Sequence, residues 1–223
     1  MRKRKDFIRL EGVRSARLVV IAAEGRDTEN IYFEAVKRHL KASNVHVEVL
    51  HRENNNSSPE NVYSQISDFK KEYNIEQDDE LWIVVDRDRW TLKSLAGIAR
   101  LCRQNQNLRF GVSNPCFELW LLLHFDDIST YEQEDLAKIA ANRKSSRRGS
   151  SFLKQQIRER MGSYQESNYD ADSLMGQADI AITRAEVLDI VPTDRWPQGV
   201  GTRVYLLMKS VMDKGKEQVN KFI

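Results

Sequence analysis

The sequence predicts an α/β fold, with a parallel-sheet core of about four strands that has helices on both faces and a helical C-terminal extension. Over roughly the first 125 residues, short apolar runs alternate with amphipathic segments. Strands that are separated by helices usually run parallel and are connected by right-handed crossovers. Beyond Asp126 the strand pattern ends and helical patterns follow.

Four segments have the pattern of strands. The segment 18–23 is apolar throughout and β-branched in its middle, as in a strand that is covered on both faces. In 45–50, valines alternate with His, Glu and Leu, which predicts a more exposed strand at an edge of the sheet. The segments 81–85 and 108–112 are the third and fourth predicted strands.

A helix is predicted after each strand. Asp27 or Thr28 is expected to begin the first helix and Pro59 the second, because these residue types favour the first positions of a helix. The fourth helix, over 117–125, is apolar on almost every side and should be buried. The residues expected on the inward faces of the first three helices are Ile31, Ala35 and Leu40, then Val62, Ile66, Phe69 and Tyr73, then Leu92, Leu95, Ala99 and Cys102.

The chain divides into three predicted parts, which together form one structural domain. Residues 1–15 are a basic N-terminal tail, because no apolar segment typical of a signal peptide follows the Arg and Lys residues. The α/β core is expected over 16–126 and the helical extension, packed on the core, over 127–223. Helical patterns lie near 131–142, 150–160, 172–189 and 202–214, and Gly199-Val200-Gly201 is interpreted as the start of the last helix.

The composition is that of a globular protein. The 35 basic residues nearly balance the 33 acidic ones, so the net charge of +2 does not by itself indicate nucleic acid or membrane binding. The two cysteines, Cys102 and Cys116, lack Cys-x-x-Cys spacing, which favours a reducing cytoplasm and a role in the core. The longest apolar run, 119–123, is far shorter than the roughly 20 residues of a membrane span. We therefore expect a soluble, cytoplasmic protein.

Acidic residues follow two of the predicted strands. Glu24 comes directly after the first strand, and Asp86 and Asp88 follow the third. Residues just past the carboxyl ends of parallel strands line the crevice in which such sheets bind ligands. If the first and third strands are neighbours, the three carboxylates form a cluster, and their mutual repulsion requires a cation between them.

Oxygen ligands of this kind favour Mg²⁺ or Mn²⁺ over zinc, and no histidine stands at metal-ligand spacing beside them. His46 and His51 are expected on opposite faces of the second strand. A bound Mg²⁺ can polarise a phosphoryl oxygen and lower the pKa of water, so phosphodiester hydrolysis or transfer is the chemistry that fits. The alternative is that Asp88 simply caps the helix that follows it.

Two acidic motifs and three further segments resemble a known family. Glu24-Gly25 at the end of the first strand and Asp86-Arg87-Asp88 at the end of a later one resemble the Toprim signature. Together with Thr28-Glu29, Tyr32-Phe33 and the segment 114–125 (Asn-Pro-Cys-Phe-Glu-Leu-Trp-Leu-Leu-Leu-His-Phe), they resemble the RloB-like family over most of the chain.

The resemblance implies a Toprim-like nuclease that is part of a phage-defence system of the abortive-infection kind and works with an ATPase encoded nearby. The ATPase would be a separate chain, because the sequence has no Gly-x-x-x-x-Gly-Lys-Ser/Thr motif. The substrate is left open between RNA and DNA, and so is the formation of a homo-oligomer.

Two further sets of residues are candidates for the site. Glu118, in the apolar fourth helix, needs a cation or hydrogen-bond donors, and we expect it either to support the metal site or to make a structural hydrogen bond. The basic loop, whose members Arg143, Lys144, Arg147 and Arg148 are followed by Lys154, is the best candidate for binding a nucleic-acid backbone. A merely solvated loop is the alternative.

Two functional hypotheses follow. In the first, the protein is a Mg²⁺-dependent nuclease in which Glu24, Asp86 and Asp88 are metal ligands and catalytic residues, with Glu118 as a supporting ligand or orienting group. In the second, the protein is a non-catalytic subunit whose carboxylates hold a cation for structure while its helical half docks on an ATPase. Replacement of Asp86 separates the two hypotheses, because it should abolish only activity in the first and also lower stability in the second.

Overall fold

The computed structural model describes residues 4–8, 16–41, 44–52 and 57–219, with side chains of the last helix described as far as residue 212. Within these residues one five-stranded sheet has the strand order β2-β1-β3-β4-β5. The first four strands are parallel and the fifth is antiparallel to its neighbour. The strands are β1 (Arg17–Ala23), β2 (Val45–Leu50), β3 (Glu80–Asp86), β4 (Leu108–Asn114) and β5 (Gly201–Thr202).

This arrangement confirms the predicted α/β fold with a mostly parallel sheet and helices on both faces. β2 lies at the edge, and its three valines are buried while the residues between them are partly exposed. β1 and β3 pair directly, with Ala23 opposite Val84. The carboxyl ends of the strands that precede Glu24 and Asp86 are therefore adjacent.

The short fifth strand is a difference from the prediction, because it lies within the segment that was interpreted as the start of a helix. Its residues pair with the end of β4, and the hydroxyls of Ser113 and Thr202 are 2.8 Å apart. The Asn114 amide nitrogen donates to the carbonyl oxygens of residues 197, 198 and 199. The C-terminal part of the chain is thus tied into the sheet and is not helical throughout.

Helices follow the strands in the predicted order. The helix predicted over 117–125 is shorter, and residues 123–125 continue as turns. Two short 3₁₀ helices span Ile128–Thr130 and Asp172–Gln177. The α-helices are α1 (Thr28–His39), α2 (Pro59–Glu72), α3 (Leu92–Arg103), α4 (Glu118–Leu122), α5 (Gln133–Ala141), α6 (Phe152–Met161), α7 (Ala178–Leu188) and α8 (Val204–Val219).

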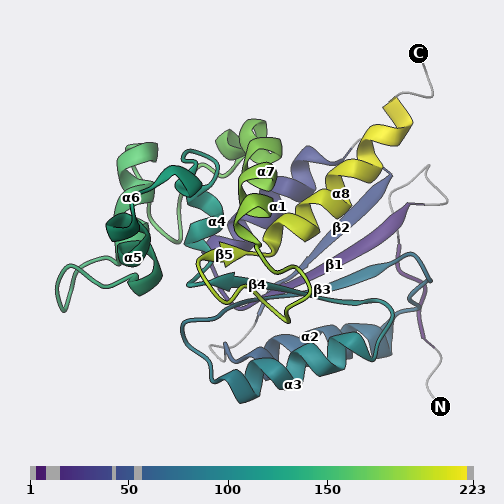
Figure 1. Cartoon of the computed structure of the whole chain (residues 1–223). Coiled ribbons are helices and arrows are strands. Elements are labelled where there is room, and N and C mark those ends of the chain that lie inside the picture. Colours follow the sequence, from purple (N-terminus) through teal and green to yellow (C-terminus); the bar gives the residue numbers. More distant parts are fainter. Residues whose placement is uncertain (1–3, 9–15, 42–43, 53–56, 220–223) are drawn as a thin grey trace.

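The sheet separates two apolar layers, because side chains of a strand alternate between its faces. Leu18, Val20 and Ala22 of β1 pack with α2 and α3, whereas Val19 and Ile21 pack with α1, α4, α7 and α8. Figure 1 shows α2 and α3 below the sheet, with α1, α7 and α8 above it and α5 and α6 to one side. Both faces of the sheet are therefore covered, as the continuous apolar runs require.

Two predicted helix faces need correction. Tyr32 and Phe33 form the centre of the buried face of α1, whereas Ile31 and Leu40 are only partly buried. Leu92, predicted to point inward, is 58% exposed because it is the first residue of α3 and projects before the helix meets the sheet. These errors do not alter the positions of the helices.

The predicted basic tail lies largely outside the described residues. Within 4–8, the Lys5 N–H donates to the Glu72 carbonyl at 2.8 Å, and the Phe7 ring packs against Phe69 and Tyr73. The described part of the predicted tail is therefore docked on the end of α2. No helix in the described part of the chain is both long enough and apolar enough to cross a membrane.

Candidate metal centre

The site lies where three adjacent parallel strands end. Glu24 follows β1, Asp86 is the last residue of β3, and Cys116 comes two residues after β4. Backbone hydrogen bonds hold these ends together, because the Glu24 N–H donates to the Val84 carbonyl at 2.9 Å and the Asp88 N–H to the Pro115 carbonyl at 3.2 Å. The sheet thus fixes the backbone of the site.

Glu24 is almost completely buried, with 2% of its surface exposed. Its Oε2 accepts hydrogen bonds from the Trp90 indole N–H at 2.7 Å and the Asp86 backbone N–H at 3.1 Å. Its Oε1 is buried and has no hydrogen-bond partner among the described residues. Burial raises the pKa of Glu24 despite the two hydrogen bonds, so the carboxylate has one oxygen in need of a proton or a cation.

Asp86 is held from the side of β4. Its Oδ1 accepts a hydrogen bond from the Phe117 backbone N–H at 2.8 Å. Burial and the neighbouring carboxylates of Glu29, Glu118 and Glu24 raise its pKa well above the ordinary value. Like charges at this spacing favour protonation or a bound cation.

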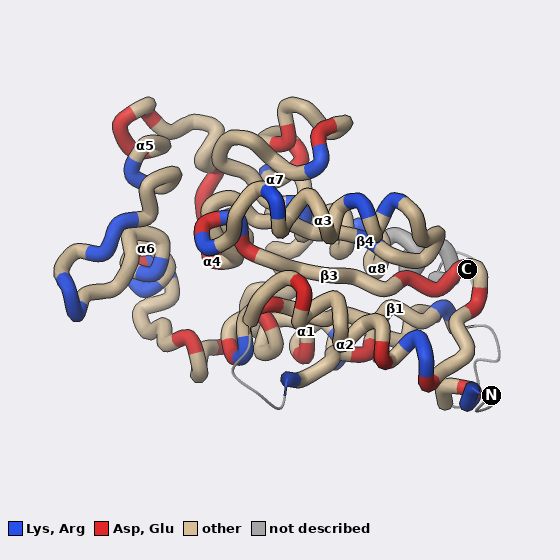
Figure 2. Tube along the Cα trace, turned by 90° about the horizontal axis from the view of Figure 1, so that it is seen from below, with Lys and Arg blue, Asp and Glu red and all other residues tan. Residues whose placement is uncertain are grey.

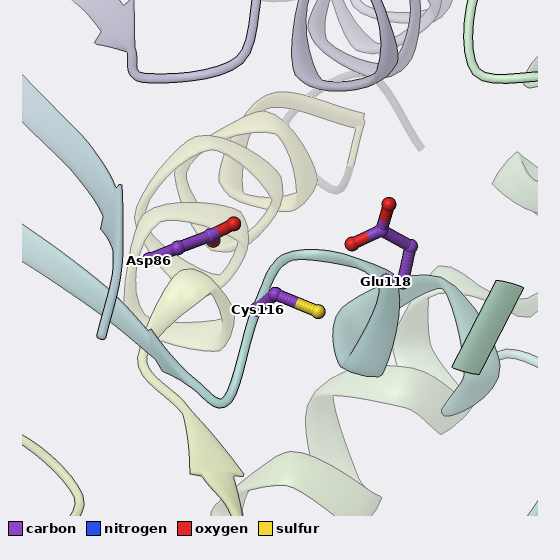
Figure 3. A group of neighbouring side chains, drawn as sticks. All are labelled: Asp86, Cys116 and Glu118. Atoms are coloured by element: carbon purple, nitrogen blue, oxygen red, sulfur yellow. The ribbon is translucent and has the colours of Figure 1, made fainter. Parts of the chain in front are cut away.

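The tightest group of potential metal ligands includes a residue outside the predicted site. Among the described residues, one atom each of Asp86, Cys116 and Glu118 lies within 4.8 Å of the other two. Figure 3 shows the two carboxylates and the sulfur converging on one space. Burial and the carboxylates of Glu118 and Asp86 raise the pKa of Cys116, which keeps the thiol protonated without a cation.

Glu29 is a second residue that the sequence analysis did not assign to the site. It lies in the first turn of α1, is 6% exposed, and its Oε1 accepts the Gly25 N–H at 2.9 Å. Burial, Glu118 and Glu24 raise its pKa to about 7. A Cβ atom on Gly25 would lie 1.5 Å from Glu29 Oε2, so any side chain at 25 would displace this carboxylate.

Asp88 stands in the turn that follows β3, not in an extended segment. Its side chain is partly exposed, and burial raises its pKa while Arg89, 4.0 Å away, lowers it. The alternative role as a helix cap is wrong, because Thr91 is the N-cap of α3 and its hydroxyl oxygen accepts the Ser94 N–H. Asp88 is thus free to face the cavity.

The carboxylates surround one cavity of about 530 Å³ at the end of the sheet. Lys154 of α6 enters it, with its Nζ 3.4 Å from Glu118 Oε1 and 2.5 Å from Glu166 Oε1. Lys154 thus lines the cavity together with Lys144 of the basic loop, and its part in binding a nucleic-acid backbone stays a prediction. The acidic residues of the wall are Glu24, Asp27, Glu29, Asp86, Asp88, Glu118 and Glu166, and the basic ones are Arg26, Arg52, Arg89, Lys144 and Lys154.

The residues of this cavity fit a divalent cation. One buried oxygen lacks a partner, and the pKa of Glu24, Glu29, Asp86 and Asp88 is raised in each case. Burial is the largest cause in each case and neighbouring carboxylates add to it, and a cation would favour the charged form of all four groups. The oxygen donors suit Mg²⁺ or Mn²⁺, and no histidine lines the cavity in the described part of the chain.

The histidines have other partners. His51 Nε2 is 3.0 Å from Glu34 Oε1 and His46 Nε2 is 3.7 Å from Glu48 Oε2, both outside the cavity. His124 is buried between the Tyr32 hydroxyl and the Trp120 carbonyl, and burial lowers its pKa to about 4. It is a neutral residue of the core.

The basic loop joins α5 to α6 at the outer edge of the molecule, where Figure 2 shows its basic segments. Arg143, Lys144, Arg147 and Arg148 are all exposed, and Lys144 also lines the cavity. Tyr164 follows α6 in the chain. It is buried, and its hydroxyl lies 3.5 Å from that of Thr28, so it packs the fold.

The model of the RloB-like protein family matches residues 19–211. This chain belongs to the RloB-like family. The match confirms the family that the acidic motifs predicted, and it covers every predicted site residue from Glu24 to Arg148. No curated protein and no solved structure matches the chain.

In this RloB-like protein, the structure brings Glu24, Asp86, Asp88 and Glu118 to one cavity. Their roles as ligands stay predictions. Glu29 is not among the residues predicted for the site, and Cys116 is predicted only for the core. The signal for Glu29 was its place in the first turn of the helix that follows Glu24-Gly25, and the signal for Cys116 was its place two residues after a strand end.

Proposed function

We propose that this RloB-like protein is a Mg²⁺- or Mn²⁺-dependent phosphodiesterase that cleaves RNA or DNA. The observation that carries the proposal is the cavity at the ends of β1, β3 and β4, where a buried glutamate oxygen without a partner meets several carboxylates of raised pKa. Such a site has the donor types and the crowding of charge that a divalent cation requires.

Each acidic residue has a distinct part in the proposal. Glu24, Asp86 and Asp88 are the candidate ligands and catalytic residues, with Glu118 as a supporting ligand or orienting group. When bound, the cation would supply a Lewis acid for the phosphoryl oxygen and lower the pKa of a nucleophilic water. The hydrogen bonds from Trp90, Asp86 and Phe117 fix two of the carboxylates in advance.

The basic side chains of the cavity suit a phosphodiester substrate. Arg89 and Lys154 lie among the carboxylates and can contact the anionic phosphate, while Lys144 connects the cavity to the exposed loop. Under the proposal, the four exposed basic residues of that loop follow the nucleic-acid backbone. We therefore infer a polymer, and not a small phosphate ester, as the substrate.

The family resemblance supports a place in phage defence together with a separate ATPase. The chain has no phosphate-binding Gly-x-x-x-x-Gly-Lys-Ser/Thr loop of its own. Under the proposal the ATPase is a second chain that activates or positions the nuclease.

A second candidate is the non-catalytic metal-binding subunit that docks on the ATPase. The salt bridges of Lys154 favour it, because this ammonium group already neutralises part of the acidic cavity without a metal. In that case a cation and Lys154 together would hold the ends of the strands to α6.

The test is cleavage of labelled single- and double-stranded RNA and DNA with Mg²⁺, Mn²⁺ or a chelator. It is run with the protein alone and with any ATPase encoded beside it. Asp86→Asn and Asp88→Asn are compared with Asp78→Asn, which changes an exposed acid before β3, at the other end of the strand.

The proposal predicts metal-dependent fragments that both site variants lose and the control retains. Cleavage that persists with the chelator or in Asp86→Asn would contradict it. A folded, metal-binding protein that cleaves none of these substrates with the ATPase present would favour the non-catalytic subunit.

A further inference from the structure

The ligand group at the centre of the cavity contains sulfur. Asp86 ends β3, Cys116 follows the Asn114–Pro115 cis peptide, and Glu118 begins α4, so two short segments supply the three donors (Figure 3). Their donor atoms lie within 4.8 Å of one another. Ligand atoms around one tetrahedral cation are roughly 3.5 Å apart when the metal–oxygen and metal–sulfur bonds have their usual lengths. Small side-chain shifts therefore suffice to bring the three together.

A second observation points to a cation in the same cavity. Glu24 lines this cavity, and only 2% of its surface is exposed. Its Oε1 has no hydrogen-bond partner among the described residues. It offers one more oxygen donor on the wall of the same cavity. A buried carboxylate oxygen without a donor is costly unless a cation or a proton is present.

The surroundings of the thiol differ from those of a cysteine that only fills the core. The Asn142 amide donates to Cys116 Sγ at 3.2 Å, and the Asn142 backbone adopts a left-handed conformation with φ of 39°. The same side chain accepts the Leu153 N–H at 3.0 Å, which fixes its orientation. An N–H that is held toward sulfur stabilises a thiolate. Cys102, in contrast, lies in the other core layer and lines no acidic cavity.

We propose that Asp86, Cys116 and Glu118 form a binding site for a thiophilic divalent cation such as Zn²⁺. Mg²⁺ prefers oxygen ligands and leaves the thiol protonated, whereas thiolate ligands select zinc and similar metals. On binding, the S–H bond breaks, a metal–sulfur bond forms and the proton passes to the solvent, with no change of oxidation state. The site thus distinguishes two classes of cation through one residue.

The consequence is competition at the proposed catalytic centre. Asp86 and Glu118 are shared, so a thiophilic cation at Cys116 would exclude the Mg²⁺ arrangement and inhibit cleavage. This inhibition rests on the proposed function, but the binding of the thiophilic cation does not.

Co²⁺ titration followed by absorption spectroscopy tests the binding. A cobalt–thiolate bond gives a charge-transfer band in the near ultraviolet, and the wild type should develop this band to saturation. Cys116→Ser should lose the band and Cys102→Ser should keep it. Zn²⁺ should remove the band at near-stoichiometric concentration, whereas Mg²⁺, which shares only Asp86 and Glu118, should do so only in large excess.

A wild type without the band, or a band that persists in Cys116→Ser, would overturn the proposal. If Cys116→Ser does not fold, Glu118→Gln takes its place, and its Zn²⁺ affinity, measured against a chromophoric chelator, should fall about tenfold or more. An unchanged Zn²⁺ affinity would equally overturn the proposal. Failure of the nuclease proposal would leave the cobalt band intact, and failure of the cobalt test would leave Mg²⁺-dependent cleavage intact.

Discussion

The Glu24 carboxylate accepts the backbone N–H of Asp86 at 3.1 Å, so the acidic residue after β1 is bonded to the acidic residue at the end of β3. The Asp86 side chain in turn accepts the N–H of Phe117, beyond β4. These two bonds link the ends of three adjacent strands. The carboxylates are therefore held in position before any cation binds, which is the arrangement that a preorganised metal site requires.

Trp90→Phe should weaken metal binding. The indole N–H orients Glu24 through a 2.7 Å hydrogen bond, and loss of such support commonly lowers metal affinity by about tenfold or more. Calorimetric titration with Mn²⁺ measures the effect. Trp196→Phe is the matched control, because the buried Trp196 indole N–H has no partner among the described residues. Equal losses in both variants would show that Trp90 does not act through Glu24.

Lys154→Met should strengthen metal binding. The Lys154 ammonium lies 3.4 Å from Glu118 and competes with a cation for that carboxylate. Removing one charge at a partly buried site is worth on the order of 1 kcal/mol, which corresponds to about a fivefold gain in affinity. Lys138→Met, which alters an exposed pair with Glu134 and Asp135, should change nothing. A lower Mn²⁺ affinity in Lys154→Met would mean that Lys154 shapes the site instead of competing for it.

Arg147→Ala/Arg148→Ala should weaken nucleic-acid binding without affecting metal affinity. Both side chains are exposed in the basic loop, and each phosphate contact contributes to the salt dependence of binding. The slope of log K against log salt concentration should become shallower by about 2. Arg100→Ala/Arg103→Ala, on the exposed side of α3, is the control. Identical slopes for the two double variants would show that the loop does not contact the nucleic-acid backbone.

The pH dependence of stability should contain a contribution from His124. Burial lowers its pKa to about 4, whereas the unfolded chain titrates near 6.5. Between these values the unfolded state binds a proton that the folded state does not. The contribution of His124 to the free energy of unfolding is therefore fully present above about pH 6.5. It is lost as the pH falls to about 4, and the total loss is about 3 kcal/mol.

Urea denaturation of the wild type and of His124→Phe across this range isolates the effect. The raised pKa of Glu29 and Asp86 changes stability in the opposite direction, but it does so in both proteins. The variant should thus gain stability relative to the wild type as pH falls. A difference between the two proteins that does not vary with pH would contradict a buried neutral His124.

Much of the fold could be predicted because local patterns determine it. The β-branched run of β1 and the apolar run of β3 identify buried strands, and the valine alternation of β2 identifies an edge. β5 could not be found in this way, because two residues carry no periodicity and their strand exists only through pairing with β4. The exposure of Leu92 likewise depends on where α3 meets the sheet.

The site could be predicted where an acidic residue stands at the end of an apolar strand. Glu24 and Asp86 directly follow or end apolar strands, so their shared position could be inferred. Cys116 resembled core filler because burial and metal binding both favour the same residue type. Lys154 comes from a helix of the C-terminal half, and its pairing with Glu118 depends on tertiary packing that no local pattern records.

Calorimetric titration of Mn²⁺ into the wild type, Asp86→Ala/Asp88→Ala and the Asp78→Ala control tests most directly whether these carboxylates form a metal centre. Mn²⁺ usually binds such oxygen sites more tightly than Mg²⁺, which makes it the suitable probe. The account predicts saturable binding to the wild type and the control that the double variant loses while its circular dichroism stays unchanged. Equal binding by all three folded proteins, or binding by none, would contradict it.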